Sequence, residues 1–289
     1  WGIGGLLSLC GALCYAELAA MFPKSGGDYV YITTVYGRCV GFLFGWTKLF
    51  IERTGTIAIL AVVFAESLGR VFPYEAWGMR LVSSGAILGL TTVNIIGVRY
   101  GARVQNLFTI LKVAALLALI AVGIYALATH TTVQPHFRLS PLDVPLVQSL
   151  GVALVFVLWT YGGWSEAAYV ADEVQEPART IPVSIVRGLL LTTVLYLLVN
   201  ASYLLCLPMG TLSQTRLPAV EVLRGVWGAG GAVFMSIMIA CSAFGALNGY
   251  ILTGGRLLYA IGTDHALFHA LCVVHPGTHT PVRALLVNA

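Results

Sequence analysis

The chain has 289 residues, of which 58% are apolar and only 10% are charged, and its formal net charge is +4. A soluble domain carries about 25% charged residues, so this chain has too little charge to cover a water-facing surface. The composition excludes a disordered segment, a collagen-like repeat and a small disulfide scaffold, and it predicts an all-α membrane protein with several spans.

Seven stretches are long and apolar enough to cross a bilayer, which takes about 20 mainly apolar residues. They are Gly2–Phe22, Cys39–Leu68, Leu81–Val98, Val104–Ala128, Ser149–Val170, Ile185–Leu207 and Gly231–Ile261. An eighth stretch begins near Pro281. The stretches do not alternate between polar and apolar residues, which excludes the pattern of a membrane β-barrel.

Basic residues are scattered among the connecting segments, which favours short loops beside an anionic membrane face over a nucleic-acid surface. The connections on one side of the membrane hold eight basic residues, and those on the other side hold five. Because the more basic side is usually the cytoplasmic one, the first helix is expected to run from outside to inside. The larger set is Lys24, Arg38, Arg99, Arg103, Arg179, Arg187, Arg256 and Arg283, and the smaller set is Arg70, Arg80, Arg138, Arg216 and Arg224.

The six cysteines form no C-x-x-C pair and lie mostly in apolar runs. We interpret them as packing residues, and we expect no metal or cofactor. The chain begins at Trp1 without a charged leader and stops within the apolar run Ala284–Val287. We therefore expect both ends to be cut and the chain to be a fragment of a longer transporter-sized protein.

The most informative stretch is Phe156–Glu166, which places Gly162 and Gly163 side by side within a membrane-length run. Each glycine costs about 1 kcal/mol in a helix interior relative to alanine. Two interpretations follow from the pair. Either the helix unwinds there, which a bilayer tolerates only where the backbone is buried or lines a cavity, or the helix continues and the glycines serve close packing.

An interrupted helix would present two charged ends to a small solute. The first half ends in carbonyl groups with negative partial charge, and the second half begins with amide groups with positive partial charge. Amides would hold a carboxylate and carbonyls an ammonium, which favours an amino acid. The aromatic side chains of Trp159, Tyr161 and Trp164 could wall or close such a site.

Charged residues inside the membrane runs need partners, because a lone charge at the bilayer centre costs at least about 2.5–3.5 kcal/mol. Lys48 and Glu52 are four residues apart on one helix face, and we interpret them mainly as a structural pair. Lys112 stands alone in its run. It could exchange a proton, act as a fixed cation between helices, or reach the membrane surface.

An intramembrane metal enzyme is a competing hypothesis. His265 and His269 have the spacing of metal ligands on a helix, and His275 and His279 follow. However, no glutamate lies between the first two histidines to act as a base. A solvated loop that happens to contain histidines is the simpler interpretation, and we expect no enzyme activity.

Several motifs together resemble the amino acid–polyamine–organocation transporters, and specifically their L-type amino acid transporter-like branch. The motifs cover essentially the whole chain in the order of the family. They are Gly11–Leu18 leading to Pro23–Tyr29, Thr92–Asn94 with Gly97–Arg99 and Val104–Asn106, Tyr161–Trp164 with Glu173–Pro182, and Ser242–Gly245 with Asn248–Gly249 and Arg256–Tyr259.

The resemblance implies the LeuT-like inverted-repeat fold, with twelve helices that include two inverted five-helix repeats. Residues 1–289 would then form a single transmembrane domain fragment, from the second helix of the family to the start of the ninth. The first helix, which carries the family's other break, and helices ten to twelve would be absent. We therefore expect the whole protein, rather than this exact chain, to transport.

The resemblance also implies roles for individual residues. Trp159 corresponds to an aromatic gate over the substrate, and Ser165 lies where side-chain selectivity is partly set. Thr160, Tyr161, Gly162 and Gly163 fall on the unwound segment that meets the substrate.

Two further positions are implied to take part in coupling. Lys112 corresponds to a lysine in the place of a sodium ion in sodium-coupled relatives, and Ser242 would face the same place. Transport without sodium, by exchange or with a proton, is the expectation.

These features predict a secondary transporter that moves amino acids by alternating access. A carrier of polyamines or other organic cations is the alternative, for which Glu166 is the nearby acidic candidate. The loop Gly69–Arg80 has no cysteine, so a disulfide-linked heavy chain of the kind found in animal members is not expected. We expect a prokaryotic-type carrier in the plasma (inner) membrane. The sequence leaves open the amino acid carried, the choice between exchange and proton symport, and the oligomeric state.

Overall fold

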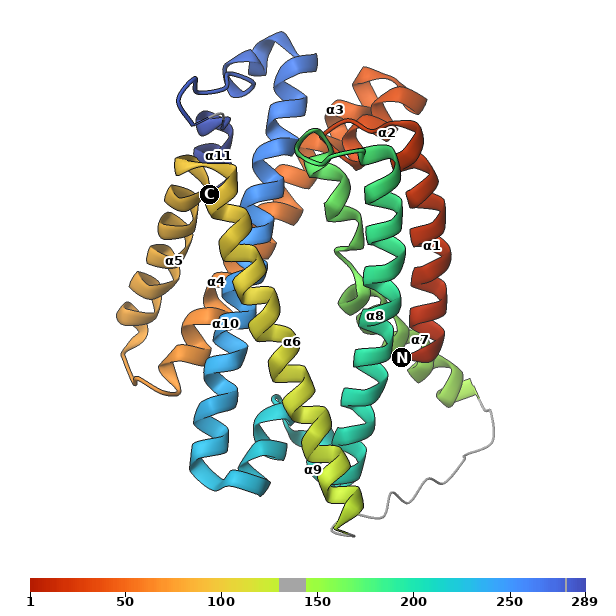
Figure 1. The fold of residues 1–289 in the computed structure, drawn as a ribbon, viewed down its shortest axis with the longest axis vertical. Helices are drawn as coiled ribbons and strands as arrows, with labels where there is room; N and C mark the ends of the chain where they lie inside the picture. Colours follow the sequence, from red (N-terminus) through yellow and green to blue (C-terminus); the bar gives the residue numbers. More distant parts are fainter. Residues whose placement is uncertain (130–143, 279) are drawn as a thin grey trace. The chain divides into compact units, whose positions relative to one another are not determined.

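The computed structural model describes residues 1–129, 144–278 and 280–289, and every regular element in these ranges is a helix (Figure 1). The fold class expected from the composition is therefore confirmed. Arg138, which was counted for the membrane orientation, and His279 lie outside the described residues.

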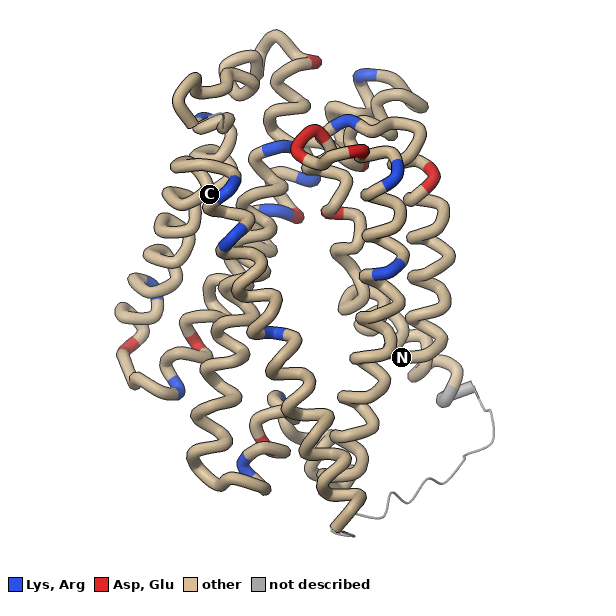
Figure 2. The backbone as a smooth tube through the Cα atoms, viewed as in Figure 1, with Lys and Arg blue, Asp and Glu red and all other residues tan. Residues whose placement is uncertain are grey.

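The helices have clear boundaries along the chain. They are α1 (Gly2–Met21), α2 (Asp28–Tyr36), α3 (Arg38–Thr47), η1 (Lys48–Arg53), α4 (Thr54–Gly69), α5 (Ala76–Ile96), α6 (Val98–Ala128), α7 (Val144–Tyr161), η2 (Trp164–Glu173), α8 (Pro177–Cys206), α9 (Met209–Gln214), α10 (Pro218–Asp264), η3 (Ala266–Leu271) and α11 (Val282–Asn288). Within the described ranges, six helical spans are long and apolar enough to cross a membrane. Charged residues are sparse along these long helices (Figure 2), as expected for a multi-pass membrane protein.

The stretch predicted from Cys39 to Leu68 is helical but is not one regular α-helix. Its middle, η1, is a π-helical segment between α3 and α4, and Thr47 and Thr54 at the two joins keep helical backbone angles. The Thr54 hydroxyl donates a 2.9 Å hydrogen bond to the carbonyl of Leu49, five residues earlier. π-Helical turns are rare and often mark functional sites, and this one contains the charged residues of the run.

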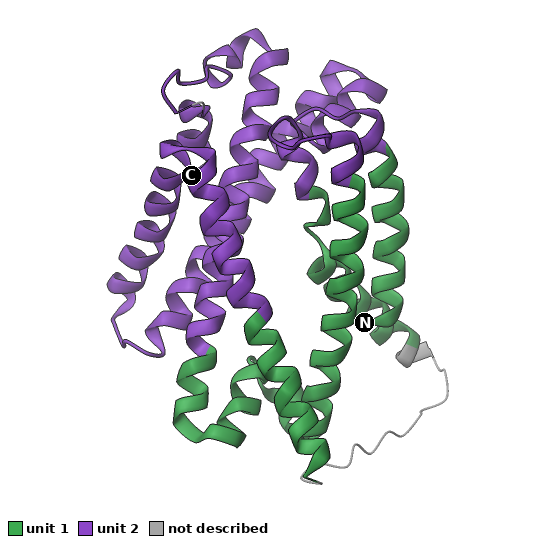
Figure 3. Cartoon of the chain, viewed as in Figure 1, with its two compact units in different colours: residues 1–17, 114–165, 182–235 green, residues 18–113, 166–181, 236–289 purple. Residues whose placement is uncertain are grey.

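The chain divides into two compact units (Figure 3). Unit 1 contains residues 1–17, 114–165 and 182–235, and unit 2 contains residues 18–113, 166–181 and 236–289. The expectation of a single transmembrane domain stays a prediction. Each unit is described by itself below.

In unit 1, glycines allow close contact between helices. A Cβ atom on Gly5 of α1 would lie 2.7 Å from the Thr193 side chain of α8, and one on Gly123 of α6 would lie 2.9 Å from the Cα atom of Ser202 of α8. Such small residues are typical of helix interfaces in membranes, where packing rather than the hydrophobic effect drives association.

In unit 2, an apolar core joins α4, α5, α10 and α11. Its buried members are Ile57, Ala61, Ala86, Leu90, Leu247, Ile251 and Leu285. A buried amide network lies among α5, α6 and α10, because the Asn94 amide donates to Asn248 at 2.9 Å and Asn248 donates to Gln105 at 3.0 Å. These buried hydrogen bonds fix how α5, α6 and α10 pack.

Candidate functional site: a helix interrupted at paired glycines

The predicted interruption is present. Helix α7 ends at Tyr161, Gly162 and Gly163 form a turn, and η2 begins at Trp164 as a 3₁₀-helix. Gly163 has a φ angle of 93°, which L-residues with side chains rarely adopt. The alternative of a continuous helix through the glycines is therefore wrong.

Gly162 occupies a position with no room for a side chain. Its amide donates a 3.0 Å hydrogen bond to the carbonyl of Trp159, which tightens the last turn of α7. A Cβ atom on Gly162 would lie 2.9 Å from that same carbonyl oxygen. Because the obstacle is backbone, the side chain could be accommodated only by moving the turn.

The residues before the turn are held by different contacts. The Thr160 hydroxyl donates to the Phe156 carbonyl at 2.8 Å, and the Thr160 carbonyl accepts a 3.4 Å bond from the Tyr196 hydroxyl. Tyr161 is 2% exposed, and its ring packs 5.2 Å from that of Tyr196. Trp159 is 73% exposed. Of the candidate substrate residues before the turn, Trp159 thus has the freest side chain.

The residues after the turn begin a new half-helix. The ring of Trp164 packs edge-on against that of Tyr15 on α1, with centroids 5.4 Å apart, and Ser165 is half-buried. All six candidate substrate residues, Trp159 to Gly163 and Ser165, belong to unit 1. The structure brings them into one turn and its flanks, and their contacts with a substrate stay a prediction.

The two residues assigned to coupling both lie in unit 2, Lys112 on α6 and Ser242 on α10. Helices α6 and α10 pack against each other. A Cβ atom on Gly249 would lie 3.6 Å from Gln105, and one on Gly245 would lie 2.6 Å from Phe108. Lys112 lies about one turn beyond Phe108 on α6 and Ser242 about one turn before Gly245 on α10, and their facing each other stays a prediction.

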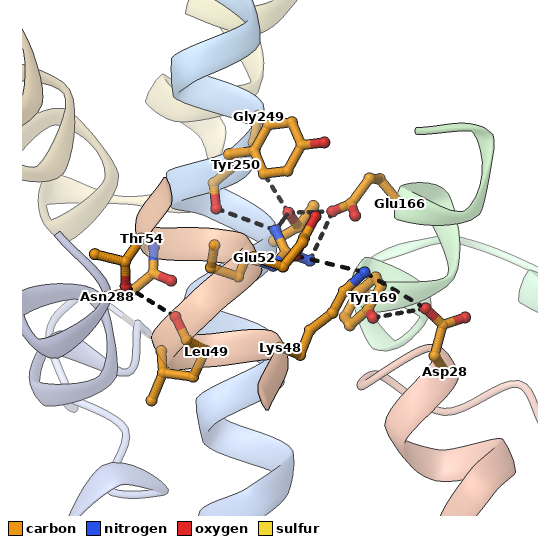
Figure 4. A network of polar contacts seen from close by, with 12 residues as sticks. Asp28, Lys48, Leu49, Glu52, Thr54, Glu166, Tyr169, Gly249, Tyr250 and Asn288 are labelled. Carbon is orange, nitrogen blue, oxygen red and sulfur yellow. Dashed lines mark hydrogen bonds and ion pairs between the residues drawn. The ribbon is translucent and has the colours of Figure 1, made fainter. Parts of the chain in front are cut away.

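Unit 2 also contains a cluster of charged side chains that sequence reasoning resolved only in part (Figure 4). The Lys48 ammonium lies 3.5 Å from Glu52, which confirms the expected pair. The same ammonium lies 3.8 Å from Asp28, whose carboxylate also accepts a 3.0 Å hydrogen bond from Tyr169. The cluster therefore links η1 to η2 and to the start of α2.

Arg53 is the residue whose role the sequence reasoning missed. Its side chain is fully buried, and its guanidinium donates to the Glu166 carboxylate at 2.8 Å and to the Thr253 hydroxyl at 2.6 Å. The guanidinium also lies 4.8 Å from the ring centre of Tyr169. A charge within the apolar run was the available signal, but its partner is too distant in sequence to identify.

The histidines considered for a metal site have other contacts. The ring of His265 packs 5.1 Å from that of Phe42, and the His269 carbonyl accepts a bond from Cys272. Among the residues that the structure describes, no group of three or more His, Cys, Asp or Glu side chains is placed to hold a metal ion.

The backbone angle at Gly163 leads to a stability prediction. We expect Gly163→Ala to lower the free energy of unfolding by about 1–2 kcal/mol, because alanine is strained at this positive φ. Gly151→Ala in α7 is the matched control, since a Cβ atom there meets nothing within 4 Å. It should be neutral or stabilising by up to about 1 kcal/mol.

Thermal unfolding of the two variants in detergent measures the difference. Equal effects of the two substitutions would show that the positive φ at residue 163 is not required.

Comparison with known proteins identifies the family of the chain. The sequence profile of the family described as amino acid permease matches residues 1–289. The b(0,+)-type amino acid transporter 1 of Mus musculus is 33% identical over 293 residues, which cover 99% of this chain and 59% of that protein. The large neutral amino acids transporter small subunit 2 of Homo sapiens is 32% identical over 296 residues, which cover 99% of this chain and 54% of that protein.

The chain thus spans between half and three fifths of the length of these curated relatives. The family is one of transporters rather than enzymes, so the metal-enzyme hypothesis is set aside. The resemblance found in the sequence motifs is confirmed: the chain belongs to the amino acid permease family.

Proposed function

We propose that the protein is a secondary transporter that carries amino acids across the membrane by alternating access. The observation that carries this proposal is the interruption between Tyr161 and Trp164 in a membrane-length helix. The end of α7 offers carbonyl groups and the start of η2 offers amide groups, which suit the ammonium and carboxylate of one small zwitterion. The names of the relatives, which are amino acid transporters, support the same substrate class.

The contacts of Glu166 favour a zwitterion over a polyamine or another organic cation. Glu166 was the acidic residue available to attract a positive substrate. Its carboxylate instead pairs with Arg53 and accepts a 2.6 Å hydrogen bond from the Thr253 hydroxyl. A carboxylate neutralised in this way offers little attraction to a second cation.

Lys112 and Ser242 are proposed to take the place of a bound sodium ion. The contacts of Gly245 with Phe108 and of Gly249 with Gln105, which lie on the same two helices α10 and α6, support this proposal. No ion pair or hydrogen bond of the Lys112 ammonium is seen within the described ranges, so the positive charge is available for a coupling role. Transport would then be independent of sodium and would proceed by exchange or with a proton.

We further propose a carrier of one subunit in the plasma membrane of a prokaryotic cell. The segment from Gly69 to Arg80 has no cysteine that could link to a heavy chain. The loop between α4 and α5 is short, because only residues 70–75 lie outside both helices. Non-reducing electrophoresis of the protein from its native membrane would test this point, and a disulfide-linked larger species would contradict it.

The first functional prediction concerns Gly162. In proteoliposomes, the whole protein should take up labelled amino acids, and Gly162→Leu should abolish this uptake because its side chain collides with the Trp159 carbonyl in the turn. Gly151→Leu, in the same helix but with open space around its Cβ position, is the control and should retain uptake. Normal uptake by Gly162→Leu would contradict the proposed site.

The second functional prediction concerns Lys112. Lys112→Ala should change the response of uptake to an imposed pH gradient, because it removes the fixed or exchangeable positive charge between α6 and α10. Lys24→Ala, outside the helices, is the control and should behave like the unmodified protein. If the Lys112 variant keeps the same pH response and substrate coupling, the lysine has only a structural role.

A further inference from the structure

Two ion pairs, each between a buried arginine and a partly exposed glutamate, hold η2, one on each side of a kink at Val170. Glu166, in the first turn of η2, pairs with Arg53 at 2.8 Å. Glu173, at the last residue of η2, pairs with Arg256 at 2.6 Å. The arginine side chains are 0% and 4% exposed, respectively. All four residues lie in unit 2, so the two pairs can be compared directly.

The Arg53 pair is anchored from two helices. Arg53 lies at the end of the π-helical segment η1, and Thr253 lies on α10. One carboxylate oxygen of Glu166 accepts hydrogen bonds from both, at 2.8 Å and 2.6 Å. Arg53 also donates to the Tyr250 carbonyl at 3.3 Å. The position of Glu166 is therefore fixed by a rigid, fork-shaped donor and a hydroxyl.

This anchoring acts close to the interruption. Glu166 is three residues past Gly163 in the chain, and a 3₁₀-helix has about three residues per turn. Restraining its carboxylate therefore restrains the first turn of the half-helix that begins after the glycines. The Arg256 pair lies seven residues further along and beyond the kink at Val170, so it cannot restrain this turn in the same way.

We propose that Arg53 is a positioning residue for substrate binding, which acts through Glu166 to hold the amide groups at the start of η2 in place. The inference rests on the proposed function, because those amides are the proposed partners of the substrate carboxylate. Arg53 is the last residue of the π-helical segment η1, and Glu52, the residue before it, lies 3.5 Å from the Lys48 ammonium and 3.8 Å from the Arg53 guanidinium. Misplacing such a group by about 1 Å is enough to weaken a substrate interaction strongly.

The test compares the two ion pairs in proteoliposomes. Arg53→Gln and Glu166→Gln should each raise the KM of amino acid uptake by about tenfold or more, while the maximal rate changes less. The double variant should be no worse than either single one, because both act on one interaction. Arg256→Gln and Glu173→Gln are the matched controls, and should lower thermal stability but leave KM within about twofold.

Conservative variants cover the case in which the glutamine variants fail to fold. Arg53→Lys keeps the positive charge but loses the planar guanidinium group, and Glu166→Asp shortens the acidic side chain by one methylene. Each should raise KM above that of the unmodified protein. Unchanged KM in the Arg53 and Glu166 variants, or an equal rise in the Arg256 and Glu173 controls, would overturn the inference.

A second readout does not depend on transport. The readout is the rate at which a maleimide labels the thiol introduced by Ser165→Cys, corrected for the labelling of the native cysteines. Adding Arg53→Gln should change this rate by about fivefold or more, and adding Arg256→Gln should not. If both substitutions leave this rate unchanged, the inference fails even where uptake is normal. If the unmodified protein shows no uptake but the labelling differs as stated, the proposed function fails, and only the part of the inference in which Arg53 positions the start of η2 stands.

Discussion

A bilayer gives exposed peptide groups no water to bind, and this constraint organises the structure around Gly162 and Gly163. Every N–H and C=O group within the hydrocarbon must find a partner in the protein or face a polar cavity. The helix nevertheless stops at Tyr161 and resumes at Trp164 with different geometry. An interruption of this kind is costly unless its peptide groups find partners. The carbonyls of Trp159 and Thr160 have partners within the protein, and we propose that a small zwitterion meets groups that remain.

Side-chain contacts hold the segments on both sides of the interruption. Tyr161 is buried against Tyr196 before the turn, and Trp164 packs against Tyr15 after it. Further along, the Glu166 carboxylate is held by a fully buried arginine. A charge pair with one buried partner gives little net stability, and we propose that this one serves to fix a single arrangement of η2. Contacts on both sides of the glycine pair are what the proposed substrate site would need in order to be preorganised.

Local features of the sequence predicted much of this arrangement. The glycine pair indicated where the helix could be interrupted, because glycine disfavours helix, but the sequence left a continuous helix as the alternative. The spacing of Lys48 and Glu52 predicted their contact, because residues four apart share a helix face. The long-range partner of Arg53 could not be predicted, since Glu166 is 113 residues away and charge alone does not select among several acids. The π-helical turn at Lys48–Arg53 was also missed, because it follows from packing rather than from any local pattern.

The central claim is that the peptide groups on the two sides of Gly162 and Gly163 bind the charged groups of an amino acid. A cryo-electron microscopy structure of the whole protein with a transported amino acid bound tests it most directly. The account predicts that the substrate carboxylate lies within hydrogen-bond distance of amides at the start of η2 and that its ammonium faces carbonyls at the end of α7. Substrate density elsewhere, or an unbroken α-helix through the two glycines, would contradict it.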